Sequence, residues 1–419
     1  MGPDAVAVVL GARLVTRSND THFPFRQDSD FLYLTGFDHP HASAVLRTDG
    51  GPPFTLYVEP RQRDAEIWNG YRPGVDGAIR DHGVDAAHSN DELVPALPKL
   101  LERARRVYHV LGRDAAVDAK LVETIDGMRL RSRTGVVPPA EIVDPRTILH
   151  EMRLFKDASE LDIMRRASDI TREGHAAAAR LARGGTYEYE LEAALDSTFR
   201  RRGASGPAYT TIVGGGRNAT VLHYVTNDQP LRDGDLVLVD AGCELAGYAS
   251  DVTRTYPVGG KLTGPARAVY EVVLAAQEAS LAVSKPGATL DEVHAASVRA
   301  LTEGMVQLGL LSGRVDDLVA TDAFRPYYMH RTSHWLGLDV HDVGSYSANG
   351  KPRTLEPGMV FTVEPGLYVA ADAEKADPRF RGIGVRIEDD VLVTPSGLEN
   401  LTAAIAKRPD DIEAWVRGA

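Results

Sequence analysis

Short hydrophobic runs separated by polar turns mark the first 140 or so residues of the chain. The runs at 5–10, 43–48 and 53–60 predict strands, because they are apolar, short and bounded by Gly, Pro or Asp. The apolar positions of 91–106 recur at helical spacing, and 107–112 is again strand-like. This alternation predicts a small amino-terminal α/β domain with a mixed sheet.

Longer periodic segments follow from about residue 158. We expect a helix pair at 158–182 and 186–203, strands within 208–258, a helix pair within 264–310, and strands within 327–343 and 358–394. The order of two helices and then strands occurs twice. It predicts an α/β (α+β) second domain made of two structurally similar halves, although no sequence repeat accompanies them.

The change of pattern coincides with the proline-containing segment 135–155, which indicates a domain boundary near residue 145. We therefore expect an amino-terminal domain at 1–145, a linker at 146–157 and a second domain at 158–419.

Two aspartates interrupt an apolar hairpin in the second domain. A tight turn at Leu245-Ala246 would place Asp240 directly opposite Asp251, with Cβ atoms roughly 4.5–5.5 Å apart. Like charges at that distance repel unless one is protonated or a cation lies between them. The alternative is that one aspartate hydrogen-bonds a turn and the other faces solvent.

Three histidines, His330, His334 and His341, lie within one short segment. The spacing of the first two would place them on one helix face, as in zinc peptidases, but no Glu follows His330 and the surrounding residues favour helix poorly. Ordinary hydrogen-bonded histidines are the alternative for each of them taken singly.

Two further acids end apolar strands. Glu364 precedes Pro-Gly, while Arg386 and Glu388 are two residues apart and so share one strand face, where a simple buried ion pair is the alternative. Together with Asp240 and Asp251, Glu364 and Glu388 make a set of four acids. Their four negative charges equal the positive charge of two divalent cations. Such oxygen-rich ligation favours Mn, Mg or Co. Two ions roughly 3.5–4 Å apart would hold a bridging hydroxide and polarise a carbonyl, which predicts a hydrolase.

Composition excludes several partners. The net charge of -12 over 419 residues argues against nucleic acid, which selects basic surfaces. No apolar run approaches the roughly 18 residues that predict a membrane span. A single cysteine and an amino terminus without a basic signal-peptide region lead us to expect a cytoplasmic protein.

The segments 239–257, 329–344, 362–368 and 384–390, in this order, resemble aminopeptidase P, of the metallopeptidases with the pita-bread fold. Segments 16–37, 63–74 and 221–228 also resemble this family, so the similarity covers most of the chain. The family has a helix before its first strand. Here the chain begins almost at 5–10, and we expect that helix to be missing or replaced.

The resemblance implies two metal ions, with Mn²⁺ expected first and Co²⁺, Mg²⁺ or Zn²⁺ as alternatives. The implied ligands are Asp240, Asp251, His334, Glu364 and Glu388. Of these, Asp251 would contact both ions, Glu388 would bridge them, and Glu364 would also carry the proton.

The resemblance also implies residues that contact the substrate. His223, His330 and His341 would bind it and stabilise the tetrahedral intermediate, and Arg386 would orient carboxylates. Tyr368 is a further candidate. Trp68 of the amino-terminal domain would close the proline side of the cleft, with ordinary core packing as its alternative.

The implied activity releases the amino-terminal residue from peptides with proline in second position, by attack of a metal-bound hydroxide. Prolidase, which cuts only Xaa-Pro dipeptides, is the alternative with the same metal set. The amino-terminal domain argues against methionine aminopeptidase, which would not need it. The metal ligands also argue against a non-catalytic protein or a creatinase-type hydrolase, because neither would need them. The family also implies a homodimer or homotetramer.

Overall fold

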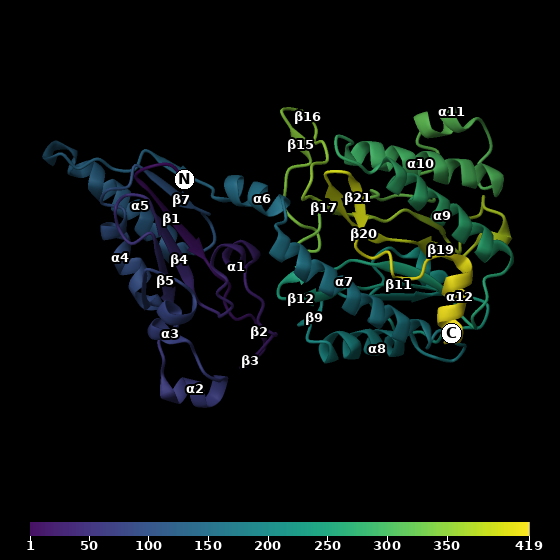
Figure 1. The fold of residues 1–419 in the computed structure, drawn as a ribbon, viewed down its shortest axis with the longest axis horizontal. Coiled ribbons are helices and arrows are strands. Elements are labelled where there is room, and N and C mark those ends of the chain that lie inside the picture. The colour runs from purple at the N-terminus through teal and green to yellow at the C-terminus, as the bar shows by residue number, and fades with distance from the viewer. Residues whose placement is uncertain (419) are drawn as a thin grey trace. The chain divides into compact units, whose positions relative to one another are not determined.

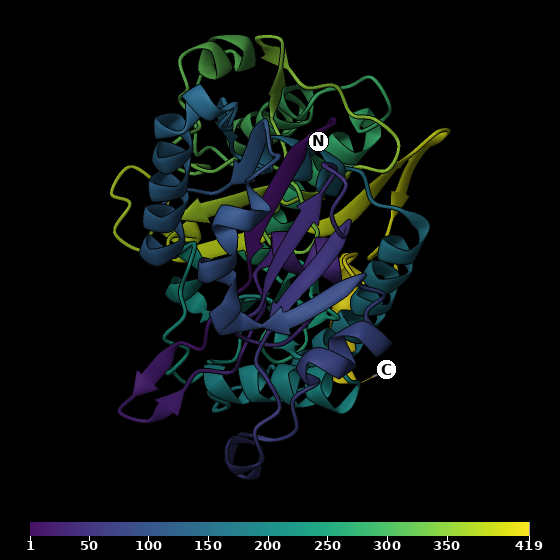
Figure 2. The same ribbon diagram turned by 90° about the vertical axis from the view of Figure 1, so that its left-hand side faces the viewer.

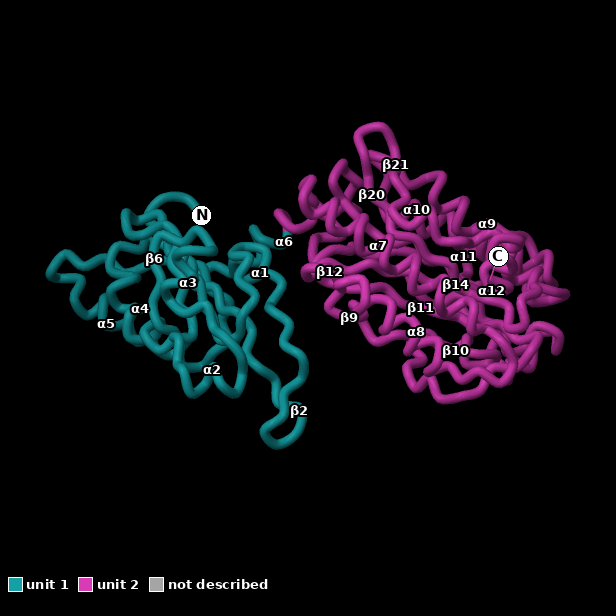
Figure 3. The backbone as a smooth tube through the Cα atoms, turned by 60° about the horizontal axis from the view of Figure 1, so that its bottom comes forward, with its two compact units in different colours: residues 1–150 teal, residues 151–419 magenta. Residues whose placement is uncertain are grey.

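The computed structural model describes residues 1–418. It forms two compact units, Met1–His150 and Glu151–Ala419 (Figure 3). The helix α6 (Arg146–Leu154) occupies most of the segment expected to be a linker. None of the described helices is long and apolar enough to cross a membrane.

A six-stranded mixed sheet in the order β6-β5-β4-β1-β7-β8 forms the centre of the first unit, as predicted (Figure 2). Strand β1 pairs antiparallel with β4 and parallel with β7. The strands are β1 (Ala5–Leu10), β4 (Ser43–Arg47), β5 (Phe54–Val58), β6 (Ala86–Ser89), β7 (Arg106–His109) and β8 (Glu141–Val143), with a separate hairpin β2 (Thr16–Ser18) and β3 (Thr21–His22).

Helices cover both faces of this sheet because β1 is apolar on both sides. Val6 and Val8 pack in a cluster with residues of α4 and α5, whereas Ala5, Ala7 and Val9 pack with residues of α1 and α3. The helices are α1 (Ser29–Thr35), α2 (Arg63–Asn69), α3 (Gly74–Asp81), α4 (Leu93–Leu100) and α5 (Ala115–Leu130), with 3-10 turns at Asn90–Glu92 and Ser132–Thr134.

The second unit repeats one arrangement twice, which confirms the expected pair of similar halves. The helix pair α7 (Ala158–Ala179) and α8 (Glu188–Arg201) precedes the sheet β10-β11-β14, and α9 (Gly264–Val283) and α10 (Leu290–Gln307) precede the sheet β17-β20-β21. In Figure 1 the strands are drawn between the two helix pairs. Asp157 caps α7 by accepting hydrogen bonds from the N–H groups of Ser159 and Glu160.

The remaining elements complete this unit. Its strands are β9 (Gly206–Pro207), β10 (Ile212–Gly215), β11 (Leu236–Asp240), β12 (Cys243–Leu245), β13 (Tyr248–Ala249), β14 (Thr253–Pro257), β15 (Ser347–Ala348), β16 (Lys351–Pro352), β17 (Val360–Val363), β18 (Gly366–Val369), β19 (Ile383–Arg386), β20 (Asp389–Thr394) and β21 (Gly397–Asn400). Shorter helices are α11 (Val315–Ala320), α12 (Pro409–Arg417) and the 3-10 turns η3 (Gly216–Thr220) and η4 (Pro378–Phe380).

The predicted register of the aspartate hairpin is wrong by two residues. The turn is Ala246-Gly247, with φ of 50° and 86°, so Leu245 pairs with Tyr248 and Asp240 pairs with Thr253. A tight turn of this kind needs positive φ at both central residues, which glycine adopts and leucine does not. A shift of two residues preserves the facing, so Asp240 and Asp251 still share one face, as diagonal neighbours.

The strands expected within 327–343 are also absent. Within the described chain this segment contributes only an isolated bridge between Trp335 and Phe361. Its backbone is instead held by single hydrogen bonds to β17, such as those from the N–H groups of Thr362 and Glu364 to the carbonyls of His334 and Thr332. In this irregular backbone His330, His334 and His341 all line one pocket.

Candidate metal centre

The predicted ligands come from both halves of the second unit and line one pocket of about 870 Å³. They are Asp240 at the end of β11, Asp251 after β13, His334 in the irregular segment, Glu364 directly after β17, and Glu388 between β19 and β20. The five residues lie at strand ends or in loops, where side chains can converge without being covered by a neighbouring strand.

Strand alternation explains why these acids face the pocket. Val237 and Val239 pack into the main core, so Leu238 and Asp240 lie on the other face of β11. The same alternation holds where Val385 and Ile387 enter the core, which confirms the predicted facing around Arg386 and Glu388. The sequence pattern that buries the strands therefore also directs their acids.

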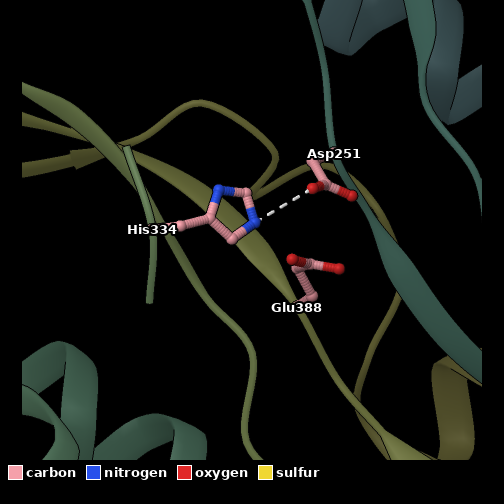
Figure 4. Close-up of side chains that lie close together, drawn as sticks. All are labelled: Asp251, His334 and Glu388. Atoms are coloured by element: carbon pink, nitrogen blue, oxygen red, sulfur yellow. Dashed lines mark ion pairs between the residues drawn. The ribbon is translucent and has the colours of Figure 1, made fainter. Parts of the chain in front are cut away.

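Three of the predicted ligands form a compact donor cluster, shown in Figure 4. Ligand atoms of Asp251, His334 and Glu388 all lie within 4.8 Å of one another. Nε2 of His334 is 3.3 Å from Oδ2 of Asp251 and 3.6 Å from Oε1 of Glu364. Nδ1 of His334 is 2.9 Å from the carbonyl of Trp335 and donates to it, so Nε2 is the nitrogen that faces the carboxylates. This orientation suits a metal ligand.

Burial of the carboxylates shifts their protonation strongly. Desolvation, followed by the neighbouring carboxylates, raises the pKa of Glu388 well above its usual range. Burial also raises the pKa of Glu364 to about 7 and raises that of Asp240. Four acids in one buried pocket are thus poorly balanced by protein cations alone. Divalent cations would remove this penalty, so the donor set fits a divalent metal centre.

Arg386 pairs with Asp240 rather than with its strand neighbour Glu388. Its Nη2 atom is 2.5 Å from Oδ2 of Asp240, and its Nη1 atom donates to the hydroxyl of Tyr368 at 3.1 Å. The simple ion pair with Glu388 is therefore not formed.

Three residues that hold the ligands were not found from the sequence. The hydroxyl of Tyr209 donates to Oδ1 of Asp240 at 2.6 Å, and that of Thr253 donates to Oε2 of Glu388 at 2.7 Å. The carboxylate of Asp390 accepts from the backbone N–H of Asp251 at 3.1 Å. The spacing of two residues from Glu388 could have indicated that Asp390 lies near the metal centre. No local sequence pattern pointed to Tyr209.

The other histidines are arranged as neighbours of the ligands. His330 has both nitrogens engaged, with the carbonyl of Arg331 at 2.8 Å and the hydroxyl of Tyr368 at 2.9 Å, and burial lowers its pKa to about 3. The ring of His341 lies 4.3 Å from that of His334, centroid to centroid. His223 lines the same pocket. The structure thus brings all four histidines into one cavity.

Trp68 lies in the other unit, on α2, with 86% of its surface exposed. Core packing, the alternative explanation for this residue, is therefore wrong for the described chain. Its role at the cleft stays a prediction.

The two-half fold and the acid-rich centre together define a metallopeptidase of the pita-bread class. Comparison with known families agrees. Residues 162–395 match metallopeptidase family M24, and residues 1–108 match the aminopeptidase P N-terminal domain.

Comparison with individual proteins identifies a smaller group within this class. The Xaa-Pro aminopeptidase of Escherichia coli is 47% identical over 100% of this chain and 95% of its own length, and that of Haemophilus influenzae is 44% identical over 99% and 93%. The solved aminopeptidase PepP of Pseudomonas aeruginosa superimposes with a TM-score of 0.97 at 45% identity, covering 100% of this chain and 95% of that one. A zinc-substituted E. coli aminopeptidase P in complex with product gives 0.95 at 47% identity, with the same coverage. The chain belongs to the aminopeptidase P group of metallopeptidase family M24.

Proposed function

We propose that two divalent cations, bound by the five-residue ligand set, carry the Xaa-Pro aminopeptidase activity of this chain. The observation that supports this most strongly is that Asp251, His334 and Glu388 come from three separate segments and place their ligand atoms within 4.8 Å of one another in one pocket. In this proposal Asp251 and Glu388 would contribute ligand atoms to both ions, and Asp240, His334 and Glu364 would complete the ligand set. We expect Mn²⁺ to be the ion in use, since most donors are oxygens.

When bound, the cations would activate water and polarise the scissile carbonyl. The protein groups supply the rest of the chemistry. Glu364 keeps 17% of its side chain exposed to the pocket, and we assign it the proton transfer towards the leaving proline nitrogen. His341 and His223 would hold the substrate and stabilise charge on the carbonyl oxygen. His330, Tyr368 and Arg386 form a connected hydrogen-bonded chain that would support them.

A tripeptide assay tests this proposal. Replacing Asp251 or Glu388 with Ala should abolish turnover of an Xaa-Pro-Xaa peptide. The midpoint of thermal unfolding, measured on the same variants, should stay unchanged and so show that they are folded. Substrate length separates the proposal from prolidase activity. Cleavage of Xaa-Pro dipeptides with little activity on tripeptides would favour the prolidase alternative.

We also propose that the chain works as a homodimer or homotetramer in the cytoplasm. Ile67, Trp68 and Tyr71 project from and beside α2 with 71–88% of their surfaces exposed, and an apolar group of this size favours burial against another chain. Light scattering coupled to gel filtration would give the number of subunits. A monomeric mass would exclude this part of the proposal.

A further inference from the structure

Glu188, the first residue of α8, is fully buried although it is not one of the metal ligands. Its carboxylate accepts four hydrogen bonds, from the N–H of Gly215 at 2.7 Å, and from Nδ2 of Asn218, the hydroxyl of Tyr224 and the N–H of Gln229 at 2.9 Å each. Among the described residues no Lys or Arg forms an ion pair with it. Its charge is therefore stabilised by these four donors.

All four donors belong to one segment, residues 215–229, and this segment carries His223. Tyr224, which Glu188 holds, directly follows His223 in the chain. Leu222, His223 and Val225 line the pocket, whereas Leu222 and Tyr224 also pack against the small cluster that contains Tyr368. The segment thus forms a pocket wall on one side and is anchored to Glu188 on the other.

The same helix holds the far end of the segment through a second acid. Asn227 is buried with a φ of 48°, and its Nδ2 atom donates to Glu192, one helical turn after Glu188, at 2.8 Å. The backbone at Gly215 also passes close to the side chains around it. A Cβ there would lie 2.6 Å from Leu231 and 3.3 Å from the Glu188 carboxylate. The segment 215–229 is therefore anchored to α8 near both of its ends.

We propose that Glu188 is a positioning residue that holds His223 at the wall of the active-site pocket. The inference rests on the role proposed above for His223. A buried carboxylate with four donors fixes a segment more rigidly than neutral acceptors would, since hydrogen bonds to an ionised acceptor are about twice as strong. Displacement of a substrate-contacting group by about 1 Å is enough to reduce turnover about 100-fold.

Glu188→Gln tests the proposal with almost no change of volume. It replaces one acceptor oxygen by an NH₂ group that would face two donors. We expect kcat/KM for an Xaa-Pro-Xaa tripeptide to fall about 10- to 100-fold, with two equivalents of Mn²⁺ still bound. Glu190→Gln is the matched control, because Glu190 is exposed on the same helix and accepts only from the N–H of Tyr187. Its activity should equal that of the wild type.

A double-mutant cycle with His223→Ala separates positioning from general damage. If Glu188 acts through His223, E188Q should change kcat/KM by less than about 3-fold in the H223A background. The same 10- to 100-fold loss in both backgrounds would overturn the inference and leave the role of His223 intact. Full activity of H223A alone would instead remove the role proposed for His223, and the inference with it. Should E188Q not fold, Y224F, which deletes one of the four donors, takes its place in the same cycle.

Discussion

The backbone at Gly242 passes so close to the chain before Asp251 that no larger residue fits. A Cβ on Gly242 would lie 1.7 Å from the carbonyl oxygen of Ser250 and 3.0 Å from the amide nitrogen of Asp251. On either side the ladder is closed by hydrogen bonds from Ala241 to Val252 and from Ser250 to Cys243. The substitution Gly242→Ala therefore pushes directly on the segment that presents Asp251 to the metal centre.

The size of the effect follows from the distance. Contacts of a Cβ below 3.0 Å are essentially never seen, so the two strands must separate by about 1.3 Å, the difference between 1.7 and 3.0 Å. That is more than twice the displacement of about 0.5 Å that a metal or catalytic site tolerates. Overpacking of this kind costs about 1–3 kcal/mol or more in unfolding free energy. We expect the affinity for Mn²⁺ to fall at least about 10-fold, as for other changes next to metal ligands.

Isothermal titration with Mn²⁺ and urea unfolding measure the two effects on one preparation. Ala246→Gly is the matched control in the same hairpin, because Ala246 adopts a φ of 50° that glycine adopts without strain. It should keep wild-type metal affinity and stability within about 1 kcal/mol. Wild-type metal affinity in Gly242→Ala would refute the hairpin register described here.

Two further predictions concern the support of the catalytic unit. Burial lowers the pKa of His175 to about 4, with its Nε2 donating to the carbonyl of Ala241 at 2.9 Å. In the unfolded chain His175 therefore binds a proton below about pH 6.5, whereas in the folded chain it binds one only below about pH 4. This stabilisation of the wild type is complete above that window and is lost as the pH falls through it, by about 3 kcal/mol. Urea unfolding of wild type and His175→Gln between pH 7.5 and 4.5 should show the variant with the shallower slope; parallel slopes would contradict the assignment. Arg254→Met should lower the unfolding free energy by about 3–5 kcal/mol, since it breaks a fully buried pair with Asp389 at 2.6 Å. The control Arg267→Met, at an ion pair whose arginine side chain is 40% exposed, should lose less than about 1 kcal/mol, and equal losses in both variants would contradict the burial argument.

Local pattern was sufficient for strands such as β1 and β11 and for the direction of their side chains, but not for the segment 327–343, where the expected strands are absent. The run at 5–10 is apolar at every position, which indicates a strand covered on both faces, and β1 is packed between two helix layers. Asp240, Glu364 and Glu388 each follow an apolar strand, so their convergence could be anticipated from the chemistry of an unpaired acid at a strand end.

Contacts between distant segments could not be read from the sequence. Tyr209 and Asp240 are 31 positions apart, and Asp390 and the N–H of Asp251 are 139 apart, so no periodicity relates them. The hairpin register failed for a different reason. Which two residues form the turn depends on which can adopt positive φ, and the Gly at 247 decided this in favour of Ala246-Gly247.

Metal stoichiometry measured together with turnover tests the central claim most directly. Chelator-treated enzyme is titrated with Mn²⁺ while binding and hydrolysis of an Xaa-Pro-Xaa tripeptide are followed in the same samples, with Glu388→Ala alongside. The account predicts two equivalents of bound Mn²⁺, activity that appears only as the ions bind, and no turnover by Glu388→Ala. Full turnover by the metal-stripped enzyme would contradict it.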